Sequence, residues 1–211
     1  MPFDFKKEYK DLYLPNTKPG VIDVPEMVFI MIDGKGNPNT SAEYSSAVEA
    51  LYGLSWTIKM SKTSETQPKG YFDFIVPPLE GMWWLDDGSD VRIKEKVRYC
   101  WTSMIRQPDF VDDAVFETVK IELARKKPHI DTSRARLEKF TEGLCVQALH
   151  IGTYDDEPRT NAAIGRFMAD NGYIDDISDT RRHHEIYLSD PRKTAPEKIK
   201  TVLRHPVRKN S

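Results

Sequence analysis

The sequence of 211 residues lacks several features that would assign it to a special class of protein. No apolar run is long enough to span a bilayer, and the N-terminus has no signal-peptide pattern, so we expect no membrane association. Only two cysteines are present, Cys100 and Cys145, each inside an apolar run and without metal spacing. We therefore expect buried, reduced thiols and a cytoplasmic location. Lysine plus arginine number 31 against 33 aspartate plus glutamate, which argues against direct nucleic-acid binding.

Motifs of several common enzyme classes are missing as well. The sequence has no phosphate-binding P-loop, no dinucleotide fingerprint and no GxSxG nucleophile elbow. His183 and His184 point to opposite faces of a predicted strand, and His150 has no second ligand at metal spacing. We therefore expect neither a metal nor an organic cofactor.

A pattern of strand, helix, strand and strand occurs twice along the chain. The first module, about residues 21–128, has strands predicted at 27–32, 71–76 and 97–101 and a helix ending near Met60. The second module, about residues 129–208, has strands predicted at 135–140, 145–151, 183–188 and 203–207 and a helix after residue 158. Residues 1–20 are predicted to form an arm that packs on the body. Two such modules predict one pseudo-symmetric α+β domain over residues 21–208, with an antiparallel sheet and a central cleft.

Tryptophan is concentrated in one short region, where Trp83, Trp84 and Trp101 occur close together. Such a cluster forms either a large core or the flat wall of a cavity, because each indole is large and its N–H needs a partner. Side chains alternate along a strand, so only one of Trp83 and Trp84 can face a given side.

The segment HHEIYLSDP, residues 183–191, reads as a short strand that ends at a proline. His183, Glu185 and Tyr187 share one face, and the opposite face is mostly apolar. Glu185 is therefore either paired at the surface or held in a cavity, since a glutamate is seldom fully buried without a partner.

Four segments together resemble the GyrI-like small-molecule-binding domain, which shares its fold with the effector domains of AraC-type and MerR-type regulators. They are PPLEGMWW at 77–84, WTSMIRQP at 101–108, VQALHIGTYDDE at 146–157 and HHEIYLSDP at 183–191. The resemblance covers roughly residues 20–208. The regulators also carry a helix-turn-helix domain, for which this sequence has no room and no basic pattern, so a transcription factor is not expected.

The resemblance implies a stand-alone GyrI-like protein. Some of these hydrolyse cyclopropanoid genotoxins of the yatakemycin and CC-1065 type, which alkylate DNA, and the reaction detoxifies them. The expected partner is thus a flat aromatic or cyclopropane-bearing small molecule. Two other functions stay open, namely sequestration of such compounds without reaction, and a contact with DNA gyrase that only the family name suggests.

The candidate site residues follow from the resemblance together with their chemistry. Glu185 is the expected base for water, because a carboxylate that loses hydration among aromatic walls can accept a proton near neutral pH. Glu80 and Tyr71 are the other catalytic candidates, although Glu80 suits a solvated loop equally well. The candidate ligand-binding residues are Trp83, Trp84, Tyr99, Trp101, His150, Tyr154, His183 and Tyr187. Core packing is the alternative for the aromatic residues, and a structural role is the alternative for His150.

Overall fold

The computed structural model describes residues 1–63, 67–87 and 96–210. The first module contains, in chain order, β1 (Gly20–Lys35), α3 (Ala42–Met60), β2 (Leu79–Leu85), β3 (Tyr99–Arg106) and α4 (Asp113–Lys126). The second contains β4 (Arg136–Ile151), α5 (Glu157–Asp170), β5 (Tyr173–Asp175), β6 (His183–Tyr187) and β7 (Lys200–Lys209). Short helical segments are α1 (Phe5–Glu8), α2 (Lys10–Tyr13), η1 (Ser61–Thr63), η2 (Lys96–Arg98), η3 (Tyr154–Asp156) and η4 (Pro196–Lys198).

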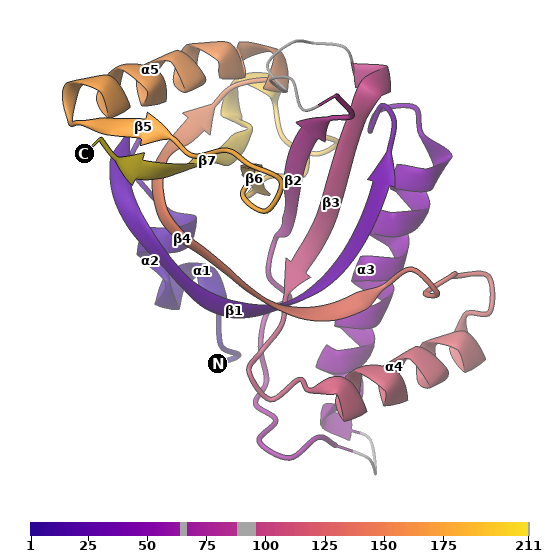
Figure 1. The fold of residues 1–211 in the computed structure, drawn as a ribbon. Coiled ribbons are helices and arrows are strands. Elements are labelled where there is room, and N and C mark those ends of the chain that lie inside the picture. Colours follow the sequence, from indigo (N-terminus) through magenta and orange to yellow (C-terminus); the bar gives the residue numbers. More distant parts are fainter. Residues whose placement is uncertain (64–66, 88–95, 211) are drawn as a thin grey trace.

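The strands form an antiparallel sheet that closes into a barrel (Figure 1). Their order is β4-β1-β3-β2-β6-β7-β5, and β4 pairs with β7 to complete the closure. Each module contributes three strands to the closed barrel in the same relative order, β1-β3-β2 and β4-β7-β6, and the pairs β1–β4 and β2–β6 join the modules. The additional strand β5 of the second module pairs with β7. This arrangement confirms the predicted α+β fold with two pseudo-symmetric modules. Closure pairs strand edges that would otherwise be open to other chains.

Several strand predictions were wrong in detail. The strand predicted at 97–101 starts only at Tyr99 and continues to Arg106, because residues 96–98 form the short helix η2. Residues 71–76 are extended but make only an isolated bridge, in which the Phe3 N–H donates to the Asp73 carbonyl and the Ile75 N–H donates to the Phe3 carbonyl. Their alternating aromatic side chains hold the N-terminal arm instead of joining the sheet, and residues 79–85 supply the strand. The strands predicted at 135–140 and 145–151 are one strand, because pairing of β4 with β1 continues past Gly143.

In each module, one helix packs against the sheet. Helix α3 starts at Ser41, whose side chain accepts a hydrogen bond from the Tyr44 N–H, and it buries Leu51, Leu54 and Ile58 against the sheet. Helix α5 buries Ile164 and Met168 against β4 and β7. Burial of these apolar side chains supplies the main driving force for this packing.

The N-terminal arm contacts the body closely. Phe5 and Tyr13 are buried, the Arg204 guanidinium donates to the Leu12 carbonyl at 2.9 Å, and the Leu149 N–H donates to the Asn16 carbonyl. Over the described ranges 1–63, 67–87 and 96–210, no helix has both the length and the apolarity to cross a membrane.

Candidate functional site

A cleft of about 1020 Å³ lies between α3 of the first module and the start of α5 of the second. Its floor is formed by the pairing of β2 with β6. The aromatic side chains that line it are Tyr44, Tyr52, Trp56, Trp83, Tyr99, Tyr154 and Tyr187. The lining carboxylates are Glu49, Asp155, Glu157, Glu185 and Asp190. This combination suits a flat, largely apolar ligand with a few polar groups.

The register between β2 and β6 places the central side chains. Gly81 is paired with Glu185, and Trp83 is paired with His183. A Cβ atom on Gly81 would lie only 2.7 Å from the Trp83 Nε1 and 3.1 Å from the Tyr187 hydroxyl. Only glycine at position 81 therefore lets the Trp83 indole and the Tyr187 phenol meet above the sheet.

Glu185 is held by two donors at the wall of the cleft. The Tyr187 hydroxyl donates to Oε2 at 2.8 Å, and the His183 Nε2 lies 3.2 Å from Oε1. The Trp83 indole donates in turn to the Tyr187 oxygen at 2.8 Å. An indole N–H can only donate, so the Tyr187 proton is directed at the carboxylate. The Glu185 side chain keeps 15% of its surface exposed, enough to meet a ligand in the cleft.

Four tyrosine hydroxyls around Glu185 stay protonated at neutral pH. Burial, and after it the Glu185 carboxylate, raises the pKa of Tyr154 to about 12 and the pKa of Tyr187 well above its ordinary value. Burial and Glu185 raise the pKa of Tyr99 and Tyr44 in the same direction. The cleft thus presents neutral O–H donors close to the Glu185 carboxylate, an arrangement able to stabilise negative charge that develops on a ligand oxygen.

The opposite face of β6 carries a buried ionic cluster. The His184 ring lies 3.0 Å from Glu142 through Nδ1 and 3.0 Å from Glu80 through Nε2, and Arg204 donates to Glu142 at 2.9 Å. Burial opposes the charge on His184, but Glu142 and Glu80 outweigh it and raise the pKa of His184 to about 9. Burial likewise opposes ionisation of Glu142, but His184 and Arg204 lower its pKa to about 2.

Most of the sequence-predicted site residues meet around the cleft. The lining includes Glu185, Trp83, Tyr99, Tyr154, His183 and Tyr187. Alternation along β2 thus puts Trp83 in the cleft, while Trp84 lies on the other face beneath the Arg182 guanidinium, 4.8 Å from the indole centre.

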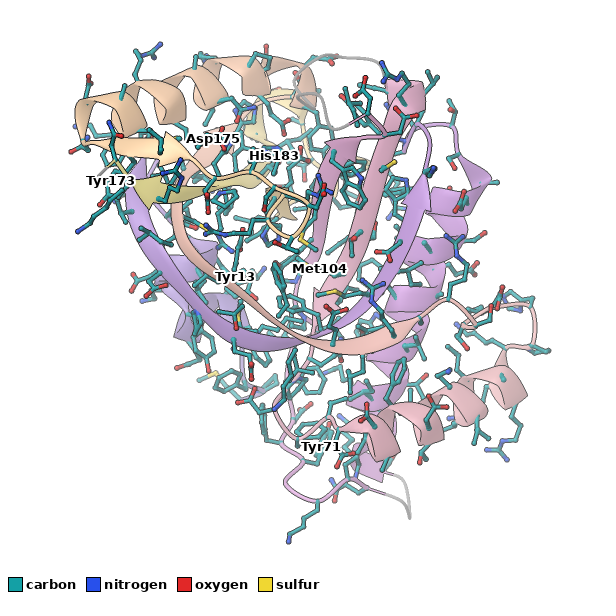
Figure 2. All side chains as sticks on the ribbon, viewed as in Figure 1. Tyr13, Tyr71, Met104, Tyr173, Asp175 and His183 are labelled. Atoms are coloured by element: carbon teal, nitrogen blue, oxygen red, sulfur yellow. The ribbon has the colours of Figure 1, made fainter. Side chains whose placement is uncertain are left out.

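Glu80 and Tyr71, the other two catalytic candidates, lie outside the cleft. Glu80 is fully buried on the opposite face of β2, where its Oε1 accepts a hydrogen bond from the Tyr13 hydroxyl at 3.2 Å. The Tyr71 hydroxyl donates to the Lys59 carbonyl at 2.6 Å, and the ring packs on Phe110. Figure 2 shows Tyr71 near α4, at the far end of the molecule from His183.

Trp101 and His150 are also placed outside the cleft. Trp101 is fully buried in the core, where its ring meets Tyr44 edge-on at 5.1 Å and fills the space over Gly34. His150 is fully buried and bonds to the Thr160 hydroxyl at 2.8 Å and to the Thr153 carbonyl at 2.9 Å.

Sequence reasoning missed two groups of residues, one that lines the cleft and one that lies next to His183. The first group consists of aromatic residues on α3, namely Tyr44, Tyr52 and Trp56. Their spacing of four and eight residues predicts a helix, but it does not tell whether the aromatic face packs in the core or lines a cleft. Asn161 and His205 stand behind His183 and come from α5 and β7, far from it in sequence. No local motif marks them. The four-residue aromatic spacing was the signal available for the first group.

No cluster of three or more potential metal ligands occurs in the part of the chain that the structure describes.

Comparison with known proteins identifies close relatives of this fold. The family model of the GyrI-like small molecule binding domain matches residues 17–208. An uncharacterized conserved protein from Listeria innocua has 51% identity and a TM-score of 0.93, with 98% of this chain and all of that one covered. A structure named as a hydrolase from Listeria innocua has 50% identity and a TM-score of 0.90, with the same coverage.

A more distant structure shares only the fold. The EcmrR C-terminal domain shares the fold with a TM-score of 0.53 at 14% identity, over 90% of this chain and 97% of that one. No curated protein matches the sequence. Because the family model covers nearly the whole chain, the protein belongs to the GyrI-like small-molecule-binding domain family.

Proposed function

We propose that this protein is a hydrolase that adds water to the cyclopropane of flat, aromatic cyclopropanoid compounds of the yatakemycin type. The observation that carries the proposal is the Glu185 carboxylate, fixed by Tyr187 and His183 on the wall of an aromatic cleft. The hydrolase name of a structure at 50% identity supports an enzymatic role, although it specifies no substrate.

The proposed substrate carries its cyclopropane fused to a conjugated dienone. The planar ring system would lie in the cleft against Trp83, Tyr99 and Tyr154. A fixed orientation of the strained ring toward Glu185 would bring a bound water and the reacting carbon together, which supplies much of the rate enhancement in such reactions.

The reaction forms one bond and breaks another without a redox change. The water oxygen bonds to the outer cyclopropyl carbon while Glu185 takes a proton from that water. The ring C–C bond breaks, and its electron pair moves through the dienone to the carbonyl oxygen, which becomes a phenolate. A proton then returns to this oxygen, so the sum is the addition of one water. Aromatisation and relief of ring strain provide the driving force.

The carbonyl oxygen of the substrate gains negative charge in this step, and hydrogen-bond donors near it would stabilise that charge. The Tyr44 and Tyr154 hydroxyls line the same cleft and stay protonated at neutral pH, as their raised pKa values show. We assign them as candidate donors to the forming phenolate.

The test is incubation of the purified protein with a yatakemycin-type cyclopropanoid, followed by liquid chromatography and mass spectrometry. We expect catalytic conversion to a product heavier by one water. Glu185→Gln keeps the shape of the side chain but removes the base, so we expect binding to persist and turnover to fall by at least about 100-fold. Full activity in this variant would remove Glu185 from the mechanism.

A second candidate function is sequestration of flat compounds without reaction. The family description as a small-molecule-binding domain favours it. An unchanged compound that nevertheless raises the melting temperature of the protein would support sequestration over hydrolysis. A contact with DNA gyrase would instead use an outer surface and would be insensitive to variants of the cleft.

A further inference from the structure

The polar contacts of Glu185 continue behind it into a buried pair of side chains. The His183 Nδ1 lies 3.1 Å from the His205 Nε2, and the same His205 nitrogen lies 3.2 Å from the Asn161 Oδ1. His183, His205 and Asn161 are each at most 6% exposed. They come from β6, β7 and α5, so three elements of the second module meet directly behind the proposed base.

The direction of these hydrogen bonds follows from what each atom can do. The Asn161 Oδ1 only accepts, so the His205 Nε2 carries a hydrogen. The His183 Nδ1 can share that hydrogen only as an acceptor, which leaves the hydrogen of a neutral His183 ring on Nε2. The His183 Nε2 then donates to Glu185, in agreement with the 3.2 Å contact.

We propose that Asn161 and His205 are positioning residues that hold His183 in the tautomer able to donate to Glu185. This inference rests on the proposed function for its catalytic meaning, but the tautomer itself is a property of the free protein. The pair would act on the reaction only through His183.

The consequence for the proposed reaction is a Glu185 side chain held in one orientation. With both donors in place, one oxygen is aimed by Tyr187 and the other by His183, so the carboxylate cannot rotate away from the bound water. Loss of the His183 donor would leave one carboxylate oxygen without a partner and free to rotate. The damage would therefore fall on turnover more than on ligand binding.

The test compares matched substitutions at the two positions. Asn161→Leu removes the acceptor, whereas Asn161→Asp keeps one. His205→Leu removes the donor, whereas His205→Gln brings an amide N–H close to the place of Nε2. His150→Gln removes a different buried histidine, one outside the cleft, and controls for a general loss of stability.

The first readout is nitrogen NMR of the His183 ring, which needs no activity. The spectra are taken in the Glu185→Gln background, because the Glu185 carboxylate only accepts and would by itself keep a hydrogen on the His183 Nε2. In this background we expect the hydrogen on Nε2 with Asn161 and His205 unchanged, in Asn161→Asp and in His150→Gln, and a mixture of the two tautomers in Asn161→Leu and His205→Leu. An unchanged His183 tautomer in folded Asn161→Leu and His205→Leu would overturn the proposal. Thermal unfolding identifies the variants that are folded.

The second readout is the steady-state kinetics of cyclopropanoid hydrolysis. We expect kcat to fall about tenfold in Asn161→Leu and His205→Leu with KM within twofold, and recovery in Asn161→Asp and His205→Gln. The tyrosines that lie around Glu185 are unchanged in the two leucine variants, namely Tyr44 on α3, Tyr99 on β3, Tyr154 in η3 and Tyr187 on β6.

The two readouts separate two kinds of failure. If the wild type does not convert the compound, the proposed function fails, and the NMR result alone decides whether Asn161 and His205 set the tautomer. If the wild type is active and the leucine variants keep its kcat, the positioning role is wrong while the hydrolase stands.

Discussion

At the scale of single residues, Tyr187 connects the floor of the cleft to the proposed base. It accepts from the Trp83 indole and donates to Glu185, each at 2.8 Å. A hydrogen bond to a charged group contributes about 1.5–3 kcal/mol, so it is among the stronger contacts in the site.

Tyr187→Phe removes this donor with little change in shape. We expect kcat for cyclopropanoid hydrolysis to fall about 10- to 100-fold while ligand affinity stays within a few-fold, because the ring still packs in the cleft. Steady-state kinetics and a ligand titration check the split. A large loss of affinity with unchanged kcat would contradict the assignment of Tyr187 to Glu185.

Gly81 is the second residue that the site requires. A Cβ atom at this position would overlap the Trp83 indole, whereas a Cβ atom at Gly165, on α5, would meet nothing within 4 Å. We expect Gly81→Ala to lower the free energy of unfolding by about 1–3 kcal/mol and to displace Trp83.

Gly165→Ala is the matched control, because the same change in an open helical position should stabilise by roughly 0.5–1 kcal/mol. Denaturant titrations followed by circular dichroism measure both variants. Equal changes in the free energy of unfolding for Gly81→Ala and Gly165→Ala would show that the crowding at Gly81 has no energetic consequence.

At the scale of elements, α3 forms one long wall of the cleft. Tyr44, Val48, Tyr52 and Trp56 follow each other at intervals of four residues and all line it. Residues four apart share one face of a helix, and twelve residues span roughly 18 Å. The wall is therefore long enough to contact a ligand with several fused rings, from Tyr44 near the floor to Trp56 at the outer end.

Trp56→Ala tests the outer end of this wall. The Trp56 side chain is half-exposed, so its removal should change stability little, and the lost stacking should weaken binding of a long flat ligand up to about tenfold. Ile121→Ala, an exposed apolar side chain on α4 away from the cleft, is the control. Isothermal titration that gave equal affinities for both variants would exclude Trp56 from the binding surface.

The elements themselves were largely predictable, and the exceptions have a physical explanation. The α3 and α5 helices and the 183–187 strand follow from local spacing, since apolar periodicity of a continuous segment depends on near neighbours. Residues 71–76 alternate like a strand, yet they form a bridge with Phe3 of the arm and do not join the sheet. Periodicity reports that a face is buried, but not what covers it.

At the scale of the whole molecule, the ionic cluster behind β6 joins several parts of the chain. Arg204 of β7 contacts Glu142 of β4 and the Leu12 carbonyl of the arm, while His184 bridges Glu142 and Glu80. The cluster therefore couples protonation to the stability of the entire fold.

The pH dependence of stability follows from the signs of two pKa shifts. The folded pKa of His184 is raised to about 9, so its contribution is complete below its unfolded value near 6.5 and is lost as pH rises through 9. The folded pKa of Glu142 is lowered to about 2, so its contribution is complete above its unfolded value near 4.5 and is lost as pH falls toward 2. We expect maximal stability between roughly pH 4.5 and 6.5 from this pair.

Urea unfolding at a series of pH values measures this profile, and NMR of the His184 ring measures its titration directly. The alkaline loss of stability should be on the order of 3 kcal/mol, and His184→Gln should lack it. A His184 ring that titrates near its ordinary pKa in the folded protein would show that the ionic cluster is not formed as described.

The sequence by itself determined the fold class, the two modules and the strand that carries Glu185, because each depends on local periodicity or on short sequence motifs specific to the family. Alternation along residues 183–187 was enough to group His183, Glu185 and Tyr187 on one face. Only the tertiary structure decided which residues share the cleft. It put Glu80, Trp101 and His150 into buried positions outside the cleft, and it brought Tyr44, Asn161 and His205 toward Glu185. The physical reason is that strand pairing and barrel closure unite residues far apart in sequence, and no local pattern encodes that register.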